Sequence, residues 1–330
     1  MVLNYEKKIG KKLKIGFIFP GQGSQFLGMG KDFYDNERIV QEMFEDANNA
    51  LKENFVKICF SSSDKILHGT IITQTAIFLV SASIYTLLAN QYGLIPDLIA
   101  GHSLGEYSAV FAGGGLNFFD ALYLLNKRAK FMKDAMEKQD GGLLAALNIN
   151  IDTLRSICDR YDHSDNIDHV AEVAIFNSPT QVVISGTNKE LNLIADDIEI
   201  MRGKSVKIPV AGAFHSRLLK EAEQEYAVYL IKADFHPLRI PVVNNVMARV
   251  IKSPEEIKMS LVKQTSSHVY WWDSMQHFKD MDIIIEVGPN NKFTKMLKRE
   301  WPNKPIFSIN NYADIKTVLK TIEELEAHKK

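Results

Sequence analysis

Apolar runs alternate with helical patterns along the first 138 residues of this chain. Residues 14–19 form an apolar run that ends at Pro20-Gly21, which is typical of a central strand, and residues 94–100 form a second run. Apolar residues at helical spacing predict helices over 37–55, 73–92, 104–112 and 119–138. Strands that alternate with helices favour a mostly parallel sheet covered on both faces.

The pattern changes after Gly141-Gly142. From there the sequence predicts the order strand, helix, strand, strand, helix, strand, over 143–149, 152–159, 173–177, 181–185, 190–201 and 205–210. This order is the ferredoxin-like arrangement. Predicted strands at 240–246, 283–287 and 305–309 and a helix over 316–328 then resume the first pattern.

Together these patterns predict an α/β fold in two parts. Residues 1–138 and 212–330 would form a large, discontinuous subdomain with a mostly parallel sheet, flanking helices and a hydrolase-like core. Residues 139–211 would form a small ferredoxin-like subdomain inserted into it.

Composition narrows the class of protein. A net charge of −1, with 46% hydrophobic and 24% charged residues, is ordinary for a soluble globular chain and argues against one that coats nucleic acid. Cys59 and Cys158 stand apart from any Cys/His cluster, so we expect free buried thiols and no metal site. No apolar run approaches the roughly 20 residues that span a bilayer, and residues 1–14 lack the apolar core of a secretory signal. We therefore expect a cytoplasmic protein, or one of an organelle stroma or matrix if a targeting segment was removed.

The segment Gly101-His102-Ser103-Leu104-Gly105 lies where the second apolar run gives way to a helix. A Gly-x-Ser-x-Gly pattern in that context is typical of a nucleophile elbow, and its glycines leave out the Cβ atoms that would clash in so tight a turn. The serine then lies beside the first free N–H groups of a helix, which can stabilise an oxyanion. The hypothesis is acyl transfer through Ser103.

A serine nucleophile needs a base, and histidine has a suitable pKa. Among nine histidines, His215 follows a predicted strand at the exit from the small subdomain, which would direct it to the cleft. The residues alone give it only a small lead over His268. His102 adjoins Ser103 but would point away from it, as a structural residue or a wall of the pocket. The sequence predicts surface positions for the others, His68, His163, His169, His236, His277 and His328.

Seven segments of the chain resemble those of malonyl-CoA:acyl-carrier-protein transacylases, the loading enzymes of bacterial-type fatty acid synthesis. The segments are 19–25, 101–108, 128–132, 177–179, 212–216, 243–246 and 286–289. Each is weakly specific, but all occur in the family's order along nearly the whole chain. The chain is therefore identified as a member of this family.

The resemblance implies a role for each matching residue. Ser103 would be acylated, and His215 would be the general base that activates it. The backbone carbonyl of Gln264 would orient His215 in place of an aspartate. The main-chain N–H groups of Gln22 and Leu104 would form the oxyanion hole.

The resemblance also implies which residues contact the acyl group. Arg128 would grip the malonyl carboxylate with two parallel hydrogen bonds, although on its sequence alone it would be assigned to a solvated basic face. Phe214 matches the malonyl-selecting version of the histidine segment. Asn177 and His102 complete the expected substrate pocket.

The implied reaction is a two-stage transfer of malonyl from malonyl-CoA to the phosphopantetheine thiol of acyl carrier protein, through a malonyl-Ser103 ester. It needs no cofactor and no metal. The partner is an acidic, phosphopantetheinylated carrier that a basic rim would attract, with Lys130, Lys204, Lys207 and Arg217 as candidates, and the enzyme would act as a monomer.

Three alternatives remain open from the sequence. An α/β-hydrolase esterase or thioesterase would run Ser, acid, His with its histidine near the carboxyl end, unlike His215. An acyltransferase of a polyketide assembly line would share the chemistry and differ in its carrier. An inactive carrier-binding scaffold would keep the fold without serine acylation.

Overall fold

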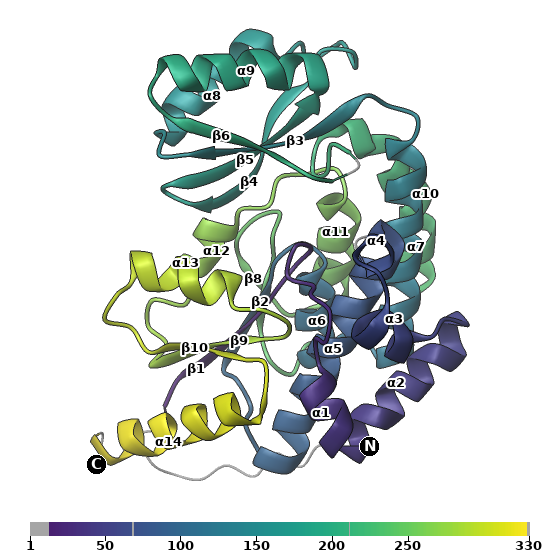
Figure 1. Cartoon of the computed structure of the whole chain (residues 1–330), viewed down its shortest axis with the longest axis vertical. Helices are drawn as coiled ribbons and strands as arrows, with labels where there is room; N and C mark the ends of the chain where they lie inside the picture. Colours follow the sequence, from purple (N-terminus) through teal and green to yellow (C-terminus); the bar gives the residue numbers. More distant parts are fainter. Residues whose placement is uncertain (1–12, 68, 211, 329–330) are drawn as a thin grey trace.

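The computed structural model describes residues 13–67, 69–210 and 212–328. Within these ranges the strands form two sheets, a six-stranded one in the lower part of Figure 1 and a four-stranded one at its top. The expectations for residues 1–12, which concern a secretory signal, and for His68 lie outside the described residues.

The large sheet has the strand order β10-β9-β1-β2-β7-β8. Its strands are β1 (Ile15–Phe19), β2 (Leu98–Gly101), β7 (Val242–Val243), β8 (Val250–Ile251), β9 (Ile283–Val287) and β10 (Ile306–Ile309). All neighbours pair in parallel except β7 and β8, which are antiparallel. The prediction of a mostly parallel sheet is therefore confirmed.

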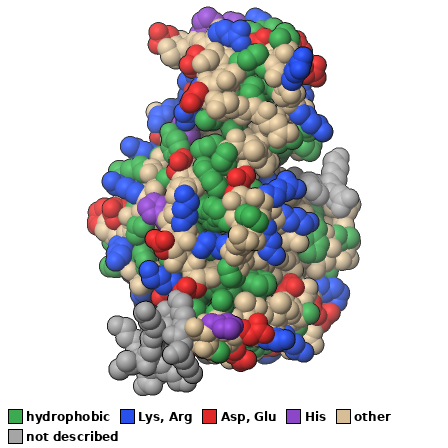
Figure 2. Space-filling view, turned by 90° about the vertical axis from the view of Figure 1, so that its left-hand side faces the viewer, with side chains coloured by type: hydrophobic (Ala, Val, Ile, Leu, Met, Phe, Trp, Pro, Cys, Tyr) green, Lys and Arg blue, Asp and Glu red, His purple; other side chains and the backbone are tan. Residues whose placement is uncertain are grey.

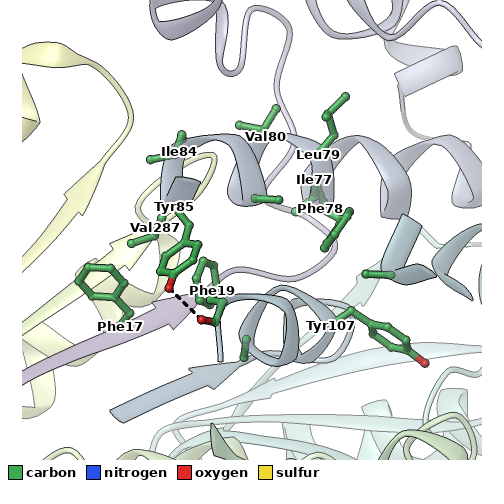
Figure 3. Close-up of a cluster of buried hydrophobic side chains, with 14 of the residues drawn as sticks. Phe17, Phe19, Ile77, Phe78, Leu79, Val80, Ile84, Tyr85, Tyr107 and Val287 are labelled. Atoms are coloured by element: carbon green, nitrogen blue, oxygen red, sulfur yellow. Dashed lines mark hydrogen bonds between the residues drawn. The ribbon is translucent and has the colours of Figure 1, made fainter. Parts of the chain in front are cut away.

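Helices cover both faces of this sheet. Successive side chains of a strand point to opposite faces, and in these strands apolar residues of both sets pack in two separate cores. Phe17 and Phe19 of β1 contact Tyr85 of the long helix α5, as Figure 3 shows, whereas Ile18 packs in a second core with Trp271. The helices of the large subdomain are α1 (Lys31–Asn36), α2 (Arg38–Leu51), α3 (Phe55–Ser61), α4 (Asp64–Leu67), α5 (Thr70–Tyr92), α6 (Gly105–Ala112), α7 (Phe118–Met136), η1 (Arg217–Leu219), α10 (Lys220–Lys232), α11 (Pro254–Gln264), α12 (Trp271–Gln276), α13 (Lys292–Glu300) and α14 (Tyr312–His328).

Helix α5 corrects the expectation that no apolar run is long enough to span a bilayer. Its 23 residues have a mean hydropathy of 1.8 over the most apolar window, which is enough by length and composition. However, 83% of that window is buried inside the protein. Its apolar surface is therefore covered by α2, α6 and α7 and by the large sheet, as in the core helix of a globular fold.

The small sheet is antiparallel and has the order β4-β5-β3-β6. Its elements follow the chain as β3 (Gly141–Leu147), α8 (Ile151–Tyr161), β4 (Ala171–Ser178), β5 (Gln181–Thr187), α9 (Asn188–Ile200) and β6 (Lys204–Ile208). Both helices lie over one face of the sheet (Figure 1) and share a core with it. This topology is ferredoxin-like, as predicted.

Several predicted boundaries were wrong. The predicted helix 37–55 ends at Leu51, and a separate helix starts at Phe55, because Asn54 caps it by accepting a hydrogen bond from the Lys57 N–H. Only Val242–Val243 of the predicted strand 240–246 pairs in the sheet. Helices α10 to α13 were not predicted.

Candidate active site

Ser103 lies at a strained turn between β2 and α6. Its backbone has a φ of 53°, a left-handed conformation that is uncommon for a residue with a Cβ. The turn requires glycine on both sides, since a Cβ at Gly101 would lie 1.9 Å from the Gly105 carbonyl oxygen and one at Gly105 would lie 2.5 Å from the Phe19 carbonyl oxygen. The sequence pattern thus forms the expected nucleophile elbow.

Asn245, two residues after the end of β7, holds the backbone of the elbow in place. Its Oδ1 accepts a hydrogen bond from the Ser103 N–H at 2.7 Å, and its Nδ2 donates to the Gly101 carbonyl at 2.7 Å. Sequence reasoning noted the segment 243–246 without assigning a role to this asparagine. An amide that both donates and accepts is what this position requires.

A line of hydrogen bonds joins Ser103, His215 and Gln264. The Ser103 Oγ lies 2.8 Å from the His215 Nε2, and the His215 Nδ1 lies 2.9 Å from the Gln264 carbonyl oxygen. Because a carbonyl only accepts, Nδ1 carries the proton and Nε2 is the free acceptor for the serine hydroxyl. His215, and not His268, is therefore beside the serine; His268 instead donates from Nδ1 to the Val173 carbonyl.

Arg128 points inward and is 1% exposed, which rules out the solvated basic face. Its Nη1 donates to the Gln74 Oε1 at 2.7 Å, and its Nη2 donates to the Gln264 Oε1 at 3.0 Å and the Ser103 Oγ at 3.1 Å. Among the described residues it makes no ion pair, and its Nε is buried without a partner. A buried guanidinium held only by neutral groups keeps its charge available to an anion.

The N–H groups of Gln22 and Leu104 flank the elbow. The loop that carries Gln22 follows β1 and approaches closely, because a Cβ at Gly21 would lie 2.5 Å from the His102 carbonyl oxygen. Within the described residues, neither N–H donates to a protein acceptor. Both donors are therefore available to an oxygen bound beside Ser103.

The remaining predicted pocket residues bridge the two subdomains. The His102 Nε2 lies 3.1 Å from the Oδ1 of Asn177 on β4, and its ring packs between Trp271 and Phe293. Phe214 is buried and packs in the same core. His102 is thus buried beside the elbow with its ring against two aromatic side chains, and Trp271 packs in the core.

Burial keeps the imidazoles of the site neutral. Desolvation, followed by the nearby Arg128 charge, lowers the pKa of His215 to about 3. Desolvation likewise lowers the pKa of His102 to about 3. Desolvation also raises the pKa of the buried Glu106 carboxyl, which sequence reasoning missed, to about 7.

Surface positions are confirmed for His163, His236, His277 and His328. His169 is partly buried and bonds through Nδ1 to the Glu190 carboxylate at 2.7 Å. Both cysteines are free and buried, as predicted. Among residues 13–67, 69–210 and 212–328, no group of three or more His, Cys, Asp or Glu side chains could hold a metal ion.

Comparison with known proteins gives consistent matches along the chain. The model of the acyl transferase domain matches residues 16–299. A malonyl CoA-acyl carrier protein transacylase of Bacillus subtilis is 32% identical over 315 residues, which cover 94% of this chain and 98% of the relative. One of Staphylococcus aureus is 32% identical over 306 residues, covering 92% and 97%.

Solved structures agree in fold. The malonyl CoA-acyl carrier protein transacylase from Clostridium perfringens is 30% identical, with a TM-score of 0.89, and the match covers 95% of this chain and 98% of that one. A malonyl-transacylase solved in complex with its type II PKS acyl-carrier protein is 28% identical, with a TM-score of 0.89 and coverage of 93% and 99%.

Proposed function

This chain belongs to the malonyl CoA-acyl carrier protein transacylase family, and from that premise we propose that it transfers malonyl from coenzyme A to acyl carrier protein for fatty acid synthesis, with Ser103 as the nucleophile. The observation that supports this assignment of residues is the chain of hydrogen bonds from Gln264 through His215 to Ser103. Arg128 lies beside it and, among the described residues, has no carboxylate partner.

In the first half-reaction, the Ser103 Oγ attacks the thioester carbonyl of malonyl-CoA while its proton moves to the His215 Nε2. The N–H groups of Gln22 and Leu104 hold the carbonyl oxygen as it becomes negative. The intermediate then breaks its carbon–sulfur bond, and His215 returns the proton to the departing coenzyme A thiolate. A malonyl ester remains on Ser103.

In the second half-reaction, the thiol of a phosphopantetheine arm attacks the ester and gives its proton to His215. The carbon–oxygen bond breaks, and the proton returns to the Ser103 Oγ. Coenzyme A and the carrier present the same arm, so one cleft serves both. Product release regenerates the resting line of hydrogen bonds.

Arg128 supplies the preference for malonyl over acetyl. Its guanidinium is buried, charged and held only by amide and hydroxyl oxygens, so a substrate carboxylate gives it a charged partner. An acetyl group leaves the buried charge without such a partner. Phe214 and Asn177 are proposed to line the path of the substrate.

The partner is proposed to be an acidic, phosphopantetheinylated carrier that meets a monomeric enzyme in the cytoplasm or an organelle matrix. Lys130, Lys204 and Lys207 are exposed and remain candidates for docking it. Figure 2 shows Lys and Arg side chains at both edges of the molecule below the small subdomain, which lies at the top of the view. Arg217 is no longer a candidate, because its side chain turns inward to the Asp162 and Glu172 carboxylates.

We also propose that the small subdomain comprises residues 139–211 and the large one 1–138 and 212–330. Two observations support these boundaries. The antiparallel sheet begins at Gly141 and ends at Ile208, and the chain on either side belongs to the larger subdomain.

The first test is intact-protein mass spectrometry after brief mixing with malonyl-CoA or acetyl-CoA. We expect a malonyl-sized adduct on the wild type, little with acetyl-CoA, and clearance of the adduct by a carrier thiol. Ser103→Ala should form no adduct and lose transfer while keeping its thermal midpoint, since only one hydroxyl is removed.

Other outcomes identify the alternatives. Steady release of coenzyme A with no adduct would indicate a hydrolase. No adduct and no release would indicate a scaffold or another acyl group. Substantial transfer by Ser103→Ala would remove Ser103 from its role, and clearance by a polyketide carrier alone would indicate a polyketide acyltransferase.

A further inference from the structure

Glu106 is a fully buried carboxylate in the first turn of helix α6, next to the hydrogen bonds that join Ser103, His215 and Gln264. Three donors converge on it. The Ser260 Oγ donates to Oε1 at 2.8 Å, and the Gln264 Nε2 and the Asn245 N–H donate to Oε2 at 2.5 and 3.3 Å. In its ionised form this carboxyl only accepts, and its two oxygens satisfy all three donors at once.

The bond from Gln264 determines which end of that side chain faces Arg128. The Gln264 Nε2 donates to the Glu106 Oε2 and, at 3.0 Å, to the Ser103 carbonyl. Its other end, Oε1, is thereby turned toward the Arg128 Nη2, 3.0 Å away. If the amide were reversed, an NH₂ group would face the guanidinium, and neither could accept a hydrogen bond.

Gln264, the last residue of helix α11, also carries the carbonyl that orients His215, so this one residue contacts both His215 and Arg128. Its backbone oxygen serves His215 and its side-chain oxygen serves Arg128. Only the side-chain contact depends on the orientation of the amide. A change confined to that orientation should therefore affect recognition of the carboxylate more than activation of the serine.

The identity of each group explains why a glutamine stands between Glu106 and Arg128. A carboxylate in direct contact with Arg128 would neutralise the guanidinium and compete with a substrate carboxylate. A neutral amide oxygen holds the guanidinium in place and leaves its charge free. The amide needs external acceptors to keep it turned the right way, and Glu106 provides the shorter of the two contacts, beside the Ser103 carbonyl.

We propose that Glu106 is a positioning residue for acyl-group selection: through the Gln264 amide it holds Arg128 where the malonyl carboxylate binds. This inference rests on the proposed function, in which Ser103 carries the malonyl group. It assigns Glu106 no contact with substrate.

Two conservative variants separate the position of the acceptor from its charge. Glu106→Gln keeps an oxygen at the same reach for Gln264 and Asn245, and its NH₂ can donate to the Ser260 hydroxyl, which also accepts. Glu106→Asp keeps the charge but withdraws both oxygens by one carbon–carbon bond. Ser260→Ala is the matched control, because it removes the only side-chain donor to Glu106 other than Gln264 among the described residues.

The measurement is kcat/KM for malonyl-CoA and for acetyl-CoA in the full-length enzyme, with thermal midpoints for each variant. We expect Glu106→Asp to lower the value for malonyl-CoA by roughly 10-fold or more, the scale of one hydrogen bond to a charged group, and to change the acetyl-CoA value far less. Glu106→Gln and Ser260→Ala should keep the malonyl-to-acetyl ratio of the wild type.

Three results would overturn the inference. Equal losses for both acyl groups in Glu106→Asp would make Glu106 structural, and no change in either kcat/KM value would make it irrelevant to selection. A ratio that falls in Glu106→Gln but not in Glu106→Asp would assign the effect to charge and not to position. Failure of the proposed function is distinct, because the wild type itself would then form no malonyl adduct.

Discussion

At the scale of single residues, selection of the acyl group depends on Arg128 having no charged partner of its own. Arg128→Ala should lower kcat/KM for malonyl-CoA by about 100-fold, because the carboxylate loses a charge-assisted hydrogen-bonding partner. The acetyl-CoA value should fall less or rise, since a buried charge near the acyl site is removed. Steady-state kinetics with both thioesters measure the change.

A matched variant strengthens this residue-scale test. Arg128→Lys keeps the charge but cannot donate from two nitrogens to a carboxylate and also reach Gln74 and Gln264, so its loss with malonyl-CoA should be intermediate. Equal losses for both thioesters in Arg128→Ala would mean that the arginine is structural and not selective.

At the scale of elements, the elbow brings the end of β2 so close to the start of α6 that no Cβ fits between Gly101 and the Gly105 carbonyl. In Gly101→Ala the new Cβ would meet the Gly105 carbonyl, a backbone atom that cannot turn away as a side chain can. We expect the free energy of unfolding to fall by about 1 to 3 kcal/mol and transfer to be lost, because the elbow must widen. Urea unfolding and the malonyl adduct report the two effects.

Gly142→Ala in β3 is the comparison for this element. There the nearest atom to an added Cβ is the end of a flexible side chain, the Asn188 Oδ1 at 3.2 Å. Stability and transfer should both stay close to the wild type. If Gly101→Ala behaved in the same way, the elbow would tolerate a Cβ, contrary to its geometry.

At the scale of the whole molecule, four buried groups link stability to pH. The pKa values of His102 and His215 are lowered to about 3, and those of Glu106 and Glu286 are raised to about 7, in each case mainly by desolvation. As pH falls, the unfolded state takes up protons on the histidines first, which destabilises the fold from about pH 6.5 downward. The folded state takes up protons on the carboxyls first, which stabilises it between about pH 7 and 4.5.

These opposing contributions should nearly cancel between about pH 6.5 and 4.5, and only the loss from the histidines should continue below. Each uncompensated proton changes the free energy of unfolding by about 1.4 kcal/mol per pH unit. Urea unfolding at half-unit steps from pH 7 to 4 should give a plateau and then a steep fall. Glu286→Gln should replace the plateau by a fall of about 1.4 kcal/mol per pH unit between pH 6.5 and 4.5, because the two histidines are then opposed by a single carboxyl. A wild-type curve that falls evenly from pH 6.5 would contradict this scheme.

The sequence by itself determined the features that depend on neighbours along the chain. The apolar run of β9 predicted that strand with its observed ends, Ile283–Val287, and the glycines around Ser103 predicted the elbow, since its sterics are set within five residues. The order of strands and helices in the small subdomain predicted its topology. Resemblance to a family, and not periodicity, supplied the roles of His215 and Gln264.

Only the tertiary structure decided what depends on contacts between distant segments. Helix α5 is apolar enough to cross a membrane, and the layers packed around it make it a core helix. The short pattern around Arg128 is that of a solvated face, yet Gln74 and Gln264, which lie 54 and 136 residues away, hold the side chain inside. No local pattern marks Glu106 as an acceptor for the Gln264 amide, because a hydrogen-bond network is a property of geometry in space and not of spacing along a chain.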